Sequence, residues 1–195
     1  MHSFLYFFNV FIKFFFLLTP FFALSAFLSM TAGKPEVQRK ALALKITVSV
    51  CIACFVLFFI GKYIFLLFGI TIDAFRIGAG GLLFITSVGL VQGKHAEAQN
   101  DKNDDIIVVP LSIPIIAGPA TIGAILVMSG EINGLYMKML SLVALFAAVF
   151  CVGIILFLAA SIERVLKKRG IIILSKITRL ILAALASQMI FNGIK

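Results

Sequence analysis

The sequence predicts an all-α membrane protein whose six transmembrane helices form two inverted three-helix repeats, with discontinuous first and fourth spans. Three observations predict this fold class: an apolar composition, six apolar stretches of spanning length, and landmarks that recur in the same order in both halves. Of the 195 residues, 62% are hydrophobic and only 13% are charged, which is too apolar for one water-soluble core of this size. We therefore expect one integral membrane domain, residues 1–195.

The apolar stretches have the length of membrane-spanning helices. Crossing roughly 30 Å of hydrocarbon requires about 20 apolar residues in a helix. The alternation of apolar and polar residues that a membrane barrel needs is absent, so we expect helices. The six stretches cover approximately residues 4–30, 42–61, 70–91, 108–129, 138–161 and 171–192.

Basic residues gather in two short connections between the expected spans, 34–45 and 164–169. Basic short connections mark the cytoplasmic side of a membrane. The sequence therefore predicts that the first, third and fifth connections are cytoplasmic and that both termini are periplasmic. The net charge of +9 reflects this topology, and we expect no nucleic-acid partner.

Three landmarks recur along the chain at nearly one interval. Pro20 and Pro119 are 99 positions apart, Arg76 and Lys176 are 100 apart, and Gly93 and Gly193 are 100 apart. The pattern predicts repeat halves of about 1–95 and 106–195, joined by a polar cytoplasmic connection, 92–105. Because each half has three spans, the second half must enter the membrane from the opposite side. Inverted repeats of this kind are common in secondary transporters, which bind substrate near the midplane between the halves.

The fourth span contains the stretch "IPIIAGPATIG", residues 113–123, which includes two prolines and a glycine. Proline lacks an N–H and disfavours helix in the residue before it, so we expect one half-helix to end near Gly118 and another to begin at Pro119. Backbone groups freed in a membrane must be buried or line a polar cavity. The N–H groups expected to be free at the start of this half-helix, where the helix dipole favours a carboxylate, are those of Ala120, Thr121 and Ile122.

The first span contains a weaker break signal, "LLTPFFALS". Thr19 is a candidate cap for a half-helix that begins at Pro20, and Ser25 and Ser29 follow on roughly one face. The alternative is a continuous helix with a proline kink. If both breaks exist, inversion places them opposite each other, where they would bind the two ends of a small zwitterion.

Arg76 and Lys176 lie near the starts of their spans. Anchoring at the headgroups and a functional role both remain open for these two cations. Asp73 is close enough in sequence to pair with Arg76, and the run "GAGG", residues 78–81, is best explained by close helix packing.

No acidic residue stands out as a coupling site inside the membrane, because Asp73, Glu131 and Glu163 all lie at span ends. The coupling ion, a proton or sodium, therefore stays open. The sequence has no metal-ligand cluster and no P-loop, so we expect no bound metal, no cofactor and no enzymatic activity. The expected partners are the lipid bilayer and a small zwitterionic substrate, and the oligomeric state stays open.

Three stretches of the sequence resemble the MarC family of bacterial inner-membrane proteins. They are "VVPLSIPIIAGPATIG", "AFRIGAGGLLFITSVGLVQGK" and "ILAALASQMIFNGIK". The first span departs from the family pattern N-P-I-G-x-x-P, because Thr19 stands in place of the asparagine, Phe22 in place of the glycine and Ser25 in place of the second proline.

The resemblance implies a six-span inner-membrane protein that exports small neutral amino acids, since the family includes such an exporter. The substrate would then lie among residues of both breaks: Thr19, Pro20, Ser25, Gly118, Pro119, Ala120 and Thr121. Two other functions remain open. One is a membrane scaffold that organises partners and transports nothing, and the other is a channel, which the lack of a charged ring or filter sequence disfavours.

Overall fold

The structure is a computed structural model that describes residues 2–91, 118–132 and 134–194. The described part is helical, as predicted, and contains no strand. Its helices are α1 (His2–Leu17), α2 (Pro20–Met30), α3 (Glu36–Phe68), α4 (Ile72–Val91), α6 (Pro119–Glu131), α7 (Leu135–Phe157) and α8 (Ala159–Ile194). The predicted connection 92–105 and the first half of the fourth span lie outside the described residues.

Several segments of the chain have the length and composition of membrane spans, and the first of them runs through both α1 and α2. Within the described residues, the segments that qualify are Ser3–Met30, Glu36–Gly61, Leu135–Phe157 and Gly170–Ile194, and a shorter apolar helix covers Thr121–Glu131. Large apolar side chains such as Leu67, Phe150 and Leu180 lie on the outside of the bundle. An apolar exterior is what a lipid-facing surface requires, so the chain is a multi-pass membrane protein.

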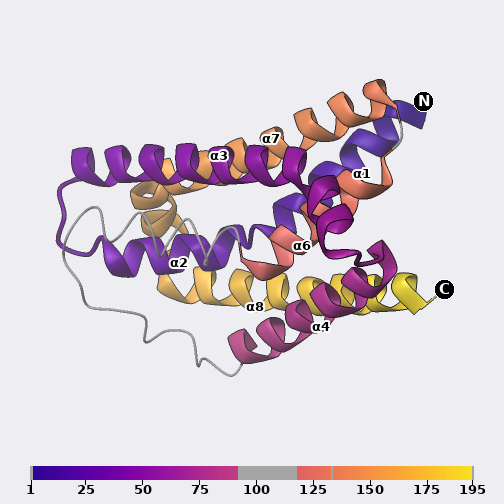
Figure 1. The fold of residues 1–195 in the computed structure, drawn as a ribbon. Coiled ribbons are helices and arrows are strands. Elements are labelled where there is room, and N and C mark those ends of the chain that lie inside the picture. Colours follow the sequence, from indigo (N-terminus) through magenta and orange to yellow (C-terminus); the bar gives the residue numbers. More distant parts are fainter. Residues whose placement is uncertain (1, 92–117, 133, 195) are drawn as a thin grey trace.

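The helices form layers (Figure 1). Helices α3 and α7 pack side by side in one layer, and α4 packs along α8 in the opposite layer. Between them, α6 contacts both α3 and α4, while α2 contacts α8 and α7. The two chain termini lie at the same end of the bundle. The core between the layers is built mainly from aromatic and branched side chains, including Phe14, Leu24, Phe27, Phe58, Ile125 and Leu145.

The α4–α8 contact depends on a glycine. A Cβ atom on Gly80 would lie 2.8 Å from Cγ1 of Ile190 and 3.0 Å from the carbonyl oxygen of Ala186, so only glycine fits this approach. Its neighbour Ala79 packs against Gly123 of α6 in the same way. The packing explanation of the "GAGG" run is thus confirmed at these two positions, whereas Gly78 and Gly81 face open space.

The expected boundaries of two connections are wrong. Helix α3 begins at Glu36 and α8 begins at Ala159, so most of segment 34–45 and all of segment 164–169 are helical. Lys and Arg have high helix propensity, and a helix can continue beyond the hydrocarbon into the headgroup region. Hydropathy marks where a span leaves the hydrocarbon, which is not where its helix ends.

Candidate functional site

The first span is broken where the sequence predicts. Helix α1 ends at Leu17 and α2 begins at Pro20, so a continuous kinked helix is excluded. Between them Thr19 has φ 48° and ψ 56°, a left-handed conformation that is rare for a β-branched residue. Backbone strain of this kind persists only where the surrounding structure enforces it, and it concentrates at functional sites.

The predicted capping role of the Thr19 side chain is wrong. Its hydroxyl makes no cap hydrogen bond, because a capping side chain needs an extended backbone at this position and Thr19 is left-handed. The residue is only 7% exposed, and among the described residues its Oγ1 atom has no hydrogen-bond partner. A buried hydroxyl without a partner costs about 1–3 kcal/mol, so this group calls for an explanation beyond packing.

The second predicted break falls at the start of α6, and the half-helix expected before it lies outside the described residues. This helix begins at Pro119, as predicted, and Gly118 is its extended N-cap residue. The N–H of Ile122 donates to the carbonyl oxygen of Gly118 at 3.0 Å, so the expectation that this N–H is free is wrong. The N–H at the fourth helical position is the first that can bond within a helix, which leaves only Ala120 and Thr121 as candidates for free donors.

The break in the first span lies against the start of α6, and we call this place the contact between the breaks. The Thr121 hydroxyl donates a 3.0 Å hydrogen bond to the carbonyl oxygen of Leu17, the last residue of α1. Because the chain breaks after Leu17, its carbonyl lacks the partner that a continuous helix would supply. Thr121 is fully buried, so in this conformation the contact between the breaks is closed.

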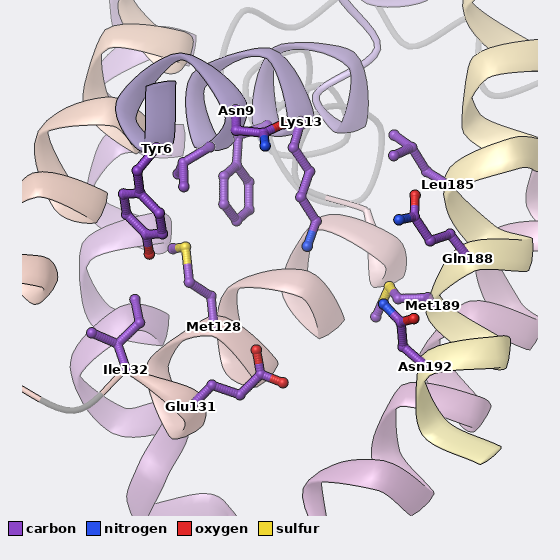
Figure 2. A pocket seen from close by; sticks show the side chains of 12 residues that line it. Tyr6, Asn9, Lys13, Met128, Glu131, Ile132, Leu185, Gln188, Met189 and Asn192 are labelled. Atoms are coloured by element: carbon purple, nitrogen blue, oxygen red, sulfur yellow. The ribbon is translucent and has the colours of Figure 1, made fainter. Parts of the chain in front are cut away.

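A cavity, seen from close by in Figure 2, lies at the end of the bundle where Figure 1 shows the chain termini. We call it the Lys13 cavity; its volume is about 350 Å³. Its walls come from α1, from the C-terminal end of α6 and from the C-terminal part of α8. Its polar lining residues are Tyr6, Asn9, Lys13, Glu131, Gln188 and Asn192.

A second cavity, of about 380 Å³, lies beyond the break in the first span. We call it the Arg39 cavity. Its polar lining residues are Ser25 and Ser29 of α2, Arg39 of α3, and Glu163 of α8. Arg39 and Glu163 form an ion pair of 3.9 Å across it. Since α1 leads from the Lys13 cavity to Thr19 and α2 leads from Pro20 to the Arg39 cavity, the closed contact lies between the two cavities.

An ion cluster borders the Lys13 cavity. Arg76 of α4 pairs with Asp73 at 2.8 Å, as predicted, and also with Glu131 at the end of α6. The same guanidinium lies 3.4 Å from the carbonyl oxygen of Asn192 in α8. Arg76 therefore joins the ends of three helices. Lys176, its counterpart by spacing, is exposed on α8 and lines neither cavity. This exposure is what anchoring at the headgroups requires.

The structure brings together only part of the predicted site. Thr19, Pro20 and Thr121 are buried at the contact between the breaks. Ser25 faces the separate Arg39 cavity instead. Helix α6 includes Pro119 and Ala120, whose side chains lie outside the described part of the chain.

Phe22, which replaces the glycine of the family pattern, packs against the last helix. The guanidinium carbon of Arg179 lies 5.6 Å from the centre of its ring, within the range of a cation–π contact. Phe22 lines neither the Lys13 cavity nor the Arg39 cavity. The added aromatic ring therefore fills space between α2 and α8 and leaves both cavities open.

Sequence reasoning missed Lys13 and underrated Glu131. The signal for Lys13 was available, because a lysine within the apolar segment Ser3–Met30 is expensive unless it serves a purpose. Nearby, the Tyr6 hydroxyl lies 2.9 Å from that of Ser141 and fixes α1 to α7 beside the cavity. No local pattern points to Glu131, since its partner Arg76 is far away in sequence.

Comparisons with known proteins agree over nearly the whole chain. A family model described as MarC family integral membrane protein matches residues 4–195. The UPF0056 membrane protein MJ1677 of Methanocaldococcus jannaschii is 34% identical, over 97% of this chain and 96% of the relative. The UPF0056 membrane protein YhcE of Escherichia coli is 33% identical, over 96% and 91%. No solved structure matches.

Proposed function

This chain belongs to the MarC family of integral membrane proteins, and from that premise we propose that it is a secondary transporter that exports small neutral amino acids or similar small metabolites. One observation carries the proposal. The break in the first span and the start of α6 are held together by the Thr121–Leu17 hydrogen bond, between cavities at opposite ends of the bundle. A transporter needs such an arrangement, in which one central site can be reached alternately from either side.

Helix packing supports the inverted repeat on which this mechanism depends. An inversion that exchanges the halves would pair α2 with α6, α3 with α7 and α4 with α8. The contact of α2 with α8 would then correspond to that of α6 with α4, and both contacts exist. The contacts α3–α7 and α4–α8 would each correspond to themselves, and both of these exist as well.

The distribution of charge supports an orientation in the inner membrane. Arg39, Lys40 and Arg164 belong to the end of the bundle that contains the Arg39 cavity. Basic residues favour the cytoplasmic side, so the Arg39 cavity faces the cytoplasm and the Lys13 cavity faces the periplasm, together with both termini.

The groups at the closed contact are suited to a zwitterion. When the Thr121–Leu17 bond opens, the Leu17 carbonyl becomes an acceptor for an ammonium group. The start of α6 and the hydroxyls of Thr19 and Thr121 become donors for a carboxylate. The buried Thr19 hydroxyl, which has no partner among the residues that the structure describes, then gains one.

Uptake into liposomes that contain the purified chain tests the proposal. Labelled glycine, alanine, serine and threonine are offered with a proton gradient and a sodium gradient imposed separately. We expect gradient-dependent accumulation of at least one amino acid, absent from liposomes without protein, and the effective gradient identifies the coupling ion.

A second function is a scaffold that organises partners and transports nothing. The tightly closed contact, with Thr121 fully buried, favours this alternative, because a static bundle needs no opening. Folded protein that accumulates none of the four amino acids under either gradient would contradict export and support the scaffold.

A further inference from the structure

The Lys13 cavity carries opposite charges on facing walls. Figure 2 shows Lys13 extending from α1 into the cavity, Glu131 reaching toward it from α6, and Gln188 and Asn192 on α8. The central contact between the breaks uses none of these residues. Their arrangement therefore needs a separate explanation.

The Lys13 ammonium needs an anionic partner. Lys13 is largely withdrawn from solvent on a helix within a membrane-spanning segment, where an unpaired charge is costly. It forms no ion pair or hydrogen bond with any residue that the structure describes. A carboxylate from a ligand would supply this partner.

The opposite wall carries a net negative charge. Asp73 and Glu131 share the single guanidinium of Arg76, so two carboxylates are balanced by one cation. Glu131 lines the cavity while Asp73 does not, so Glu131 is the carboxylate of this cluster that a ligand in the cavity can reach. An ammonium group from a ligand would balance it.

We propose that the Lys13 cavity is a binding site for a small zwitterion, whose carboxylate binds Lys13 and whose ammonium binds Glu131. The amides of Gln188 and Asn192 complete the polar wall. A volume of about 350 Å³ is near the lower end of ligand cavities, which suits a ligand of amino-acid size. A ligand with one charge alone would leave the opposite wall unpaired. The site's place on a transport path rests on the proposed function; its ligand class rests on its own charges.

Binding to the full chain in detergent micelles tests the inference with three probes. L-alanine carries both charges, L-alaninamide lacks the carboxylate, and propionate lacks the ammonium. We expect L-alanine to bind the unaltered chain at least about tenfold more tightly than either analogue, because each analogue loses one charge-assisted contact.

The variant Lys13→Met assigns the carboxylate contact. We expect it to weaken L-alanine binding by about 10- to 100-fold and to leave L-alaninamide binding within about twofold. A purely structural defect would weaken the binding of L-alanine and of L-alaninamide to the same extent. Lys13→Arg, which keeps the charge, should restore most of the L-alanine affinity. Lys45→Met, at an exposed lysine on α3 outside both cavities, is the matched control and should change the affinity for neither L-alanine nor L-alaninamide.

The outcomes separate this inference from the proposed function. If the unaltered chain accumulates alanine in liposomes and Lys13→Met binds alanine equally well, the inference is wrong while export stands. If the unaltered chain binds L-alanine no better than the two analogues, the inference is again wrong. If it neither binds nor transports any zwitterion, both fail. Should Lys13→Met not fold, Lys13→Arg and the probe series on the unaltered chain still decide.

Discussion

The substitution Thr121→Val is expected to abolish amino acid transport while the chain still inserts and folds. Valine keeps the shape of threonine but cannot donate to the Leu17 carbonyl, which would be left buried and unpaired. The cost is about 1–3 kcal/mol of stability, small enough for a bundle of this size to tolerate. The substrate would also lose a donor at the start of α6. Uptake into liposomes and the melting temperature measure the two effects separately.

Two further variants show whether the position of the hydroxyl matters. Thr121→Ser keeps the donor and should retain most of the transport. Thr178→Val removes a buried hydroxyl whose 3.0 Å bond runs to the carbonyl of Leu174 within its own helix, so it does not join α1 to α6. It should leave transport intact. Equal uptake by Thr121→Val and the unaltered chain would remove the contact between the breaks from the mechanism.

The substitution Gly80→Val is expected to lower the stability of the fold strongly, and more than Thr121→Val does. Even its first side-chain atom would lie 3.0 Å from the Ala186 carbonyl oxygen and 3.1 Å from the Ile190 nitrogen. These are backbone atoms of α8, so relief requires α4 and α8 to separate. Overpacking of this kind costs about 1–3 kcal/mol and sometimes more. We expect a lower melting temperature and a much smaller yield of monodisperse protein.

Gly81→Val is the matched control, because it places the same β-branched residue in the same helix with nothing within 4 Å of the new Cβ. Any general effect of valine on helix propensity is common to both variants. Equal melting temperatures for Gly80→Val and Gly81→Val would show that the α4–α8 approach does not limit stability.

The helix breaks could be predicted from sequence because proline acts locally. Pro20 and Pro119 each begin a helix, as their missing N–H groups require. The left-handed backbone of Thr19 could not be predicted, since threonine avoids it and only the surrounding helices enforce it. The bond from Thr121 to Leu17 joins residues 104 positions apart, and only the fold brings them together.

The two cavities were less predictable than the breaks. Lys13 could have been singled out as a charge inside an apolar span, but its relation to Glu131 depends on how α1, α6 and α8 converge. The sequence predicts Ser25 in the substrate site together with Thr19 and Thr121, yet α2 carries it to the Arg39 cavity. The spacing of residues along one helix predicts which of them share a face. It does not predict which other helix that face will contact.

Cysteine accessibility tests most directly the central claim, that the two cavities open on opposite sides of the membrane around a closed contact. Cys51, Cys54 and Cys151 are replaced by alanine, and Asn9→Cys and Ser29→Cys are introduced separately. A membrane-impermeant maleimide is then applied to right-side-out and to inverted vesicles. We expect Asn9→Cys to react from one side only and Ser29→Cys to react only from the other side. Reaction of both from the same side, or of either from both sides, would contradict the account.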